Sequence, residues 1–249
     1  MLFPDYRPRR LRQSCAFRRM IRETRLSVDD VILQIFAVGG KNVKNPITSM
    51  PGQFQLSIDK VVKLAKTTHD LGIPGIILFG LPDKKDPLGT GAYAKQGIVQ
   101  QAVKAVKDSL PDLAVITDVC LCQYTDHGHC GLVEGNTVDN DASLDLIART
   151  ALSHCRAGAD MVAPSDMMDG RIGAIREAFE TEGFPNKQIL AYSAKYASTF
   201  YGPFRDAVGS AGNLGGGNKY SYQMDPANSD EALREVELDL EEGADLSLI

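Results

Sequence analysis

Apolar runs along the chain alternate with segments in which apolar side chains recur at helical spacing. In the segment 58–71, Ile58, Val61, Val62 and Leu64 are separated by lysine and aspartate residues. This spacing places the apolar side chains on one face of an amphipathic helix. The pattern predicts helices near 58–71, 95–109, 142–157, 170–182 and 228–242. The apolar runs predict strands at 31–38, 75–79, 113–121, 161–164, 189–195 and 244–249.

The alternation of strands and helices predicts an α/β fold with a mainly parallel sheet. Two architectures agree with it, a (β/α)8 TIM barrel and a doubly wound open sheet. Chemically reactive side chains stand near the ends of several strands, at Asp118, Cys120, Ser165 and Lys195. A barrel collects the carboxyl ends of its strands in one active site, so this distribution favours the barrel. The six predicted strands are two fewer than a barrel needs, so we expect about six of its eight βα units.

Composition places the chain among globular proteins. Of its 249 residues, 43% are hydrophobic and 24% are charged, values that exclude a disordered or collagen-like chain. No apolar run approaches the ~20 residues that span a bilayer, so we expect no membrane partner. The basic N-terminus lacks the apolar segment of a secretory signal. We therefore expect a cytoplasmic protein.

Charge is unevenly distributed although the net charge is only −5. Residues 1–25 carry eight arginines against Asp5 and Glu23, whereas residues 225–245 carry nine acidic residues against Arg234 alone. A basic arm binds nucleic acid or an acidic surface of a partner subunit. Because aromatic residues do not interleave with the arginines, we expect no nucleic-acid partner. We expect residues 1–28 to form an N-terminal arm and residues 29–249 a partial TIM-barrel catalytic domain.

The five cysteines are too few and odd in number for a disulfide framework. Three of them, Cys120, Cys122 and Cys130, fall within eleven residues beside two histidines. On an extended strand Asp118, Cys120 and Cys122 share a face, and the following loop can return Cys130 to them. Three thiolates with an open fourth position suit a catalytic Zn²⁺. The alternative is three buried cysteines that act as small hydrophobic residues.

Lys195 ends an apolar strand, at the position where a barrel places its active site. A partly desolvated lysine has a lowered pKa and attacks a ketone to form a Schiff base. Position alone is a weak signal, since most lysines are solvated side chains. The sequence therefore makes Lys195 a candidate nucleophile without excluding an ordinary surface role.

The stretch 209–217 is rich in glycine but lacks the G-x-G-x-x-G pattern that opens a helix after a strand. We therefore expect a lid rather than a phosphate-binding loop. Arg205, Lys219 and Gln223 flank this stretch. Their side chains are expected to hold a substrate carboxylate.

Several of these segments together resemble one enzyme family. The cysteine segment 118–131, the segment 192–205 and the segment 222–228 are similar to porphobilinogen synthase, also called 5-aminolevulinate dehydratase. Shorter matches support the resemblance, at 7–12, 50–52, 138–142, 163–165 and 168–170. The resemblance extends over essentially the whole chain.

The resemblance implies a (β/α)8 barrel whose N-terminal arm embraces a neighbouring subunit, typically in homo-octamers. It implies a lyase that condenses two 5-aminolevulinate molecules into porphobilinogen with loss of two waters. This reaction is the first common step of tetrapyrrole and heme biosynthesis. The arginine-rich arm then has a role as an assembly element.

The resemblance also implies residue roles. Lys195 matches one of two Schiff-base lysines, and Asp118 and Ser165 match polar groups beside it. Some family members carry arginine where Lys219 stands, so the charge is kept but bidentate geometry is lost. The residues expected to contact substrate are Arg205, Lys219, Gln223, Tyr192 and Phe204.

Two metal sites follow from the resemblance. Cys120, Cys122 and Cys130 match the zinc ligands of the zinc-dependent branch, and Glu235 matches an allosteric Mg²⁺ position. For Glu235 the alternative is one acid among several on the polar face of a helix.

The match to the family pattern stops at the C-terminus of the given sequence. The family continues Gly243-Ala244-Asp245 with four mainly apolar residues and then Lys-Pro, whereas this sequence ends Leu-Ser-Leu-Ile249. The family's other Schiff-base lysine would come next, so we expect an N-terminal portion of a normal enzyme. The alternative is a non-catalytic subunit or pseudoenzyme that binds zinc and assembles with partners. An unrelated Schiff-base aldolase would leave the three cysteines unexplained.

Overall fold

The computed structural model describes residues 5–135, 137–210 and 218–249. An eight-stranded sheet runs through it in the order β10-β9-β8-β5-β4-β1-β3-β2. Neighbouring strands are parallel except β2 and β3. The strands of this sheet are β1 (Ile32–Val38), β2 (Lys44–Pro46), β3 (Phe54–Ser57), β4 (Gly75–Leu81), β5 (Ala114–Val119), β8 (Met161–Pro164), β9 (Gln188–Tyr192) and β10 (Leu246–Leu248).

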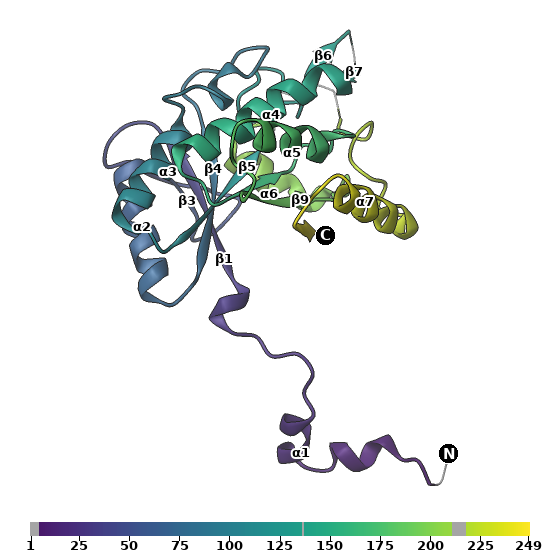
Figure 1. Ribbon diagram of the computed structural model, residues 1–249. Helices are drawn as coiled ribbons and strands as arrows, with labels where there is room; N and C mark the ends of the chain where they lie inside the picture. The colour runs from purple at the N-terminus through teal and green to yellow at the C-terminus, as the bar shows by residue number, and fades with distance from the viewer. Residues whose placement is uncertain (1–4, 136, 211–217) are drawn as a thin grey trace.

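From β3 onward, helices connect the successive parallel strands of this sheet, as Figure 1 shows. The helices are α1 (Cys15–Met20), α2 (Ile58–Asp70), α3 (Ile98–Ser109), α4 (Asn140–Ala157), α5 (Arg171–Thr181), α6 (Gly202–Ala207) and α7 (Ser229–Glu241). A small antiparallel hairpin of β6 (Leu132–Glu134) and β7 (Thr137–Asp139) precedes α4. The predicted α/β alternation is confirmed, and the expected strands correspond to β1, β4, β5, β8, β9 and β10. None of the helices in the described part of the chain is long and apolar enough to cross a membrane.

The sheet is buried on both faces, which explains its continuous apolar runs. Along β4, Ile76 and Leu78 pack into the core beneath α2 and α3. The alternate residues Ile77 and Phe79 enter a second core on the opposite face. There the ring of Phe204, on α6, lies 4.9 Å from the Phe79 ring centroid. The period of two along a strand therefore divides one apolar run between two cores.

The sequence did not predict the strands β2 and β3. They have three and four residues, and β2 includes Pro46, which lacks a backbone donor and is tolerated at a sheet edge. β3 pairs in parallel with the carboxyl-terminal half of β1, from Phe36 to Val38. Such short segments have too few residues to show a period of two, so only their tertiary pairing identifies them.

The N-terminal segment projects from the body of the protein (Figure 1). It contains a 3-10 helix at Pro8–Arg12 and the short helix α1, and neither has a buried residue. Phe17, Met20 and Leu26 are exposed there, Leu26 at 88%. The segment therefore carries apolar side chains as well as its arginines, and no other part of the described chain covers these three.

Because a histidine of α4 is buried, we expect the stability of the folded protein to fall in acid. His154 is inaccessible to solvent, and its Nδ1 lies 3.0 Å from the hydroxyl of Thr117 on β5. Burial lowers the pKa of His154 to about 3. Because the unfolded chain takes up this proton near pH 6.5 and the native protein does not, stability falls as pH drops below 6.5. At pH 5 the expected loss from this group is about 2 kcal/mol.

Denaturant unfolding at pH 7 and pH 5 measures this loss. In His154→Gln the difference in unfolding free energy between the two pH values should shrink by that amount. The matched control is Leu152→Ala, which removes a buried side chain of the same helix but no titratable group and should leave the difference unaltered. Equal pH dependence in His154→Gln and the wild type would contradict the prediction.

Candidate active site

The carboxyl ends of β5, β8 and β9 bring together the reactive residues found in the sequence. Asp118 lies near the end of β5, Ser165 follows β8, and Lys195 follows β9 by three residues. The backbone N–H of Ser165 donates to the Val119 carbonyl at 3.0 Å, which fixes the end of β8 against β5. Parallel strands present these ends at one edge of the sheet, so distant residues meet there.

Lys195 is held by a direct contact across this edge. Its Nζ donates to the Ser165 carbonyl oxygen at 2.6 Å. The Ser165 hydroxyl donates to Asp118 Oδ1 at 2.6 Å, and Asp118 is buried. The ring centroids of Tyr192 and Tyr201 lie 5.7 and 5.4 Å from Nζ. The structure thus brings Asp118, Ser165, Lys195 and Tyr192 together.

Sequence reasoning missed Gln123, which is buried beside Asp118. Its Nε2 donates to Asp118 Oδ2 at 2.6 Å, so both carboxylate oxygens of Asp118 accept a hydrogen bond. Burial raises the pKa of Asp118, and the hydrogen bonds from Ser165 and Gln123 partly oppose this. The available signal was its position, one residue after Cys122 and five after Asp118.

Cys120, Cys122 and Cys130 form a buried cluster in which all three Sγ atoms lie within 4.8 Å of one another. The Sγ atoms of Cys120 and Cys122 are 3.3 Å apart. Tetrahedral Zn²⁺ with bonds of ~2.3 Å separates its sulfur ligands by about 3.8 Å, so small movements would complete the set. The donor set and the spacing therefore fit a thiolate-bound metal.

The thiols and Lys219 are electrostatically coupled. Hydrogen bonds from Cys120 and Cys122 hold the pKa of Cys130 well below its usual value. The Nζ of Lys219 lies 3.1 Å from Cys130 Sγ. Burial would lower the pKa of Lys219, but Cys130, Cys122 and Cys120 together outweigh it and raise that pKa. Burial raises the pKa of Cys120, and the pKa of Cys122 is also raised, so Cys130 is the negatively charged member of the cluster and Lys219 is the cation beside it.

The same negative charge corrects one expectation about Lys195. We expected burial to leave Lys195 with a lowered pKa. Burial does act in that direction, but the charge of Cys130 and then Cys120 outweighs it and raises the pKa of Lys195. Activation of this amine thus depends on the charge state of the thiol cluster as well as on burial.

The two neighbouring histidines do not complete the cluster. His127 Nε2 lies 3.3 Å from the Pro87 carbonyl oxygen, and His129 Nδ1 lies 3.2 Å from the Tyr222 hydroxyl. Among the described residues, the only group with metal-ligand geometry is the set of three cysteines.

The expected carboxylate-binding residues line a small cavity next to Lys195 and Ser165. Arg205 belongs to α6, and Lys219 and Gln223 belong to the segment before α7. Phe204 lines the cavity and also packs on Phe79, so its ring is part of the core. The expected lid at 209–217 falls mostly on residues 211–217, which lie outside the described residues.

Glu235 lies in a different place from the cysteine cluster. It stands on α7 and lines a cavity of about 470 Å³ with Asp169 and Tyr222. Burial and the neighbouring Asp169 raise the pKa of Glu235. Gln223 lines this cavity as well as the one beside Lys195, so the two cavities adjoin.

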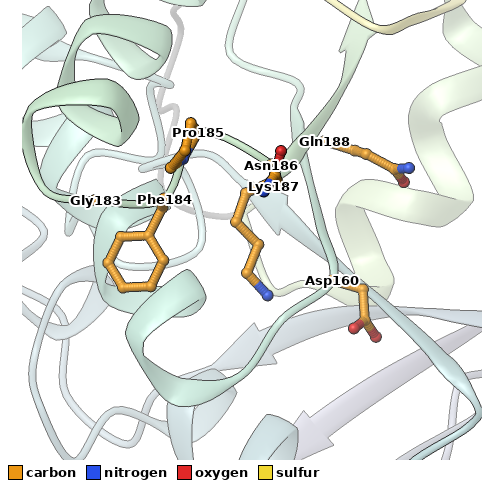
Figure 2. A pocket seen from close by; sticks show the side chains of 7 residues that line it. All are labelled: Asp160, Gly183, Phe184, Pro185, Asn186, Lys187 and Gln188. Carbon is orange, nitrogen blue, oxygen red and sulfur yellow. The ribbon is translucent and has the colours of Figure 1, made fainter.

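A further cavity of about 440 Å³ lies at the opposite end of the strands (Figure 2). Asp160 precedes β8 there, and Lys187 precedes β9. Both charged groups are paired: Asp160 with Lys107 at 2.9 Å, and Lys187 with the Ala159 carbonyl oxygen at 2.6 Å. This cavity is therefore separate from the reactive cluster, which lies at the carboxyl ends.

Comparisons with known proteins identify related sequences. The family model described as delta-aminolevulinic acid dehydratase matches residues 5–249. Proteins of that name from Synechocystis, Methanothermus sociabilis and Bacillus subtilis are 54%, 52% and 50% identical to the chain, which covers 76%, 77% and 74% of their lengths. These alignments include 100%, 100% and 98% of this chain.

A solved structure also matches. It is the delta-aminolevulinic acid dehydratase of Toxoplasma gondii in complex with its reaction product, porphobilinogen, with a TM-score of 0.95 and 42% identity. The match covers 98% of this chain and 70% of that one. It supports the barrel-type α/β fold that the sequence predicted.

Proposed function

This chain belongs to the delta-aminolevulinic acid dehydratase family, and on that premise we propose that it condenses two 5-aminolevulinate molecules into porphobilinogen with loss of two waters. The observation that carries the proposal is the meeting of Lys195 and the three-cysteine cluster at one edge of the sheet. An imine-forming amine beside a thiolate cluster suits a condensation between ketone and amine groups. The protein is then a lyase of heme and tetrapyrrole biosynthesis, and we place it in the cytoplasm.

Lys195 supplies the covalent step. Its Nζ attacks the ketone carbon of one substrate, and water leaves as the imine forms. The contact with the Ser165 carbonyl oxygen aims the amine, and the Ser165 hydroxyl and Asp118 form a path for the proton. The buried carboxylate is well suited to this task, because its raised pKa brings it nearer to neutral pH.

Cys120, Cys122 and Cys130 would hold Zn²⁺. When bound, Zn²⁺ supplies Lewis-acid polarisation and offsets the negative charge of the thiolates. Arg205, Lys219 and Gln223 hold the carboxylate of a substrate, with Tyr192 and Phe204 against its carbon chain. Arginine and lysine there provide charge-assisted hydrogen bonds.

Two further roles concern sites away from the cavity. Glu235 would hold an allosteric Mg²⁺ through its carboxylate, together with water. Residues 1–28 would act as an arm that embraces a second copy of the chain in a homo-octamer, with residues 29–249 as the catalytic domain. The exposed Phe17, Met20 and Leu26 would then be buried on assembly.

Product formation tests the proposed function. Purified protein supplied with Zn²⁺ and 5-aminolevulinate should yield a compound whose mass equals two substrates less two waters. 4-Oxopentanoate is the matched control, because it keeps the ketone and carboxylate but lacks the amine. It should yield no pyrrole. Zinc binding and imine formation without porphobilinogen would instead favour a non-catalytic subunit.

A further inference from the structure

The strands β8 and β9 separate at the end that carries the reactive residues. Their ladder comprises two pairs, Met161 with Gln188 and Val162 with Ile189. It stops short of both Ser165 and Lys195. By contrast, β5 pairs with β8 as far as Pro164, and β9 pairs with β10 as far as Tyr192. The distance between Ser165 and Lys195 is therefore not set by a backbone ladder.

Arg171 spans this separation. It is the first residue of α5, and its side chain is 3% exposed. One terminal nitrogen donates to the Tyr192 carbonyl oxygen at 3.1 Å, at the end of β9. Its Nε lies 3.9 Å from Asp166 Oδ1, in the residue that follows Ser165. The guanidinium thus hydrogen-bonds the end of β9 and forms a longer ion pair with Asp166, two residues beyond β8, next to the two residues that meet in the site.

The guanidinium is itself held in place by α7. Both terminal nitrogens donate to the carboxylate of Asp239, at 2.9 and 3.0 Å, in a bidentate pair. Asp239 is also buried. A planar guanidinium has enough donors to engage a carboxylate and a carbonyl at once, whereas an ammonium is a point charge. The site therefore requires the shape of arginine as well as its charge.

We propose that Arg171 is a positioning residue that joins the end of β9 to the β8–α5 turn and so holds the Lys195 amine against Ser165. This inference rests on the proposed role of Lys195 as the imine-forming group. Arg171 acts through Tyr192 and Asp166 and does not itself reach the cavity beside Lys195.

Borohydride capture of the Lys195 imine tests the inference. The rate of capture is measured against 5-aminolevulinate concentration in the intact zinc-loaded protein, for Arg171→Met, Arg171→Lys and Asp239→Asn. Thermal melting reports whether each variant folds. The matched control is Arg176→Met on the same helix, because Arg176 pairs with Asp245 at 2.8 Å and contacts the Lys187 carbonyl, at the amino ends of the strands.

In Arg171→Met we expect the maximal rate of capture to fall by about 10- to 100-fold, the range for a reactive group misplaced by an ångström. The half-saturating concentration should stay nearly constant, because Arg205 and Lys219 are unchanged. Arg171→Lys should recover part of the rate, and Asp239→Asn should slow capture less than Arg171→Met. Arg176→Met should capture at the wild-type rate.

A purely structural role predicts a different result. It would lower the fraction of protein that becomes labelled and leave the rate constant of the folded fraction unchanged. That result, or a wild-type rate in every folded variant of Arg171 and Asp239, would overturn the inference. If Arg171→Met does not fold, Arg171→Lys and Asp239→Asn decide by the same criterion. Absence of capture in the wild type would instead refute the proposed role of Lys195, and with it the premise.

Discussion

Replacing Lys195 with alanine is expected to abolish covalent capture of 5-aminolevulinate by borohydride. The amine donates to the Ser165 carbonyl oxygen and lies near the rings of Tyr192 and Tyr201, which makes it the nucleophile that the cavity presents. Removal of a catalytic nucleophile lowers the rate by at least about 1,000-fold. Arginine at this position keeps the positive charge but forms no such imine. Lys195→Arg should therefore fail as completely as Lys195→Ala.

Peptide mass spectrometry after capture locates the adduct. Its mass should equal one substrate less one water plus two hydrogens, on the peptide that contains Lys195. The matched control is Lys187→Ala, because Lys187 also donates to a backbone carbonyl at 2.6 Å but at the opposite end of β9. That variant should be labelled like the wild type. A label on another lysine, or undiminished labelling of Lys195→Ala, would refute the assignment.

Removal of one thiolate is expected to empty the metal site. Zinc sites with four protein ligands bind with about 10–16 kcal/mol, so one ligand accounts for about 3 kcal/mol, or roughly 100-fold in affinity. Cys130→Ala removes the thiolate that also contacts Lys219 at 3.1 Å. After dialysis the wild-type protein should retain about one zinc per chain, and Cys130→Ala should retain well below one.

Metal analysis after dialysis checks this prediction without any assay of activity. Cys155→Ala is the matched control, because Cys155 is a buried free thiol on α4 outside the cluster. It should keep its zinc. Full zinc content in Cys130→Ala would show that the cluster holds no metal through this residue, and the three cysteines would then be packing residues.

The local sequence was sufficient to predict a strand or helix where the apolar pattern repeated over many residues. The apolar run of β4 and the amphipathic segment of α2 each contain enough residues to show their period, so both were predicted close to their observed bounds. The spacing of Cys120, Cys122 and Cys130 likewise predicted a cluster, and the three Sγ atoms do meet. The expected extended strand through Cys122 is wrong, because β5 ends at Val119 and Cys122 lies in the turn that follows.

Very short strands, and contacts between residues from different elements, could not be predicted from the sequence. The hairpin of β2 and β3 depends on pairing with β1 rather than on its own residues. Gln123 contacts Asp118 because a buried turn directs its side chain back toward β5. The direction of the Lys195 pKa shift depends on thiols far from Lys195 in sequence, so burial alone led to the wrong expectation.

The sequence by itself determined which residue types this protein brings to its site and which elements carry them, because periodicity and spacing are local properties of a chain. Only the tertiary structure decided how Lys195 is aimed and charged. Lys195 contacts Ser165, and the guanidinium of Arg171 lies between β8 and β9. The charge of the thiol cluster raises the pKa of Lys195. Each of these interactions involves residues from different elements. Distances and charges across strand ends follow from packing, which no local pattern specifies.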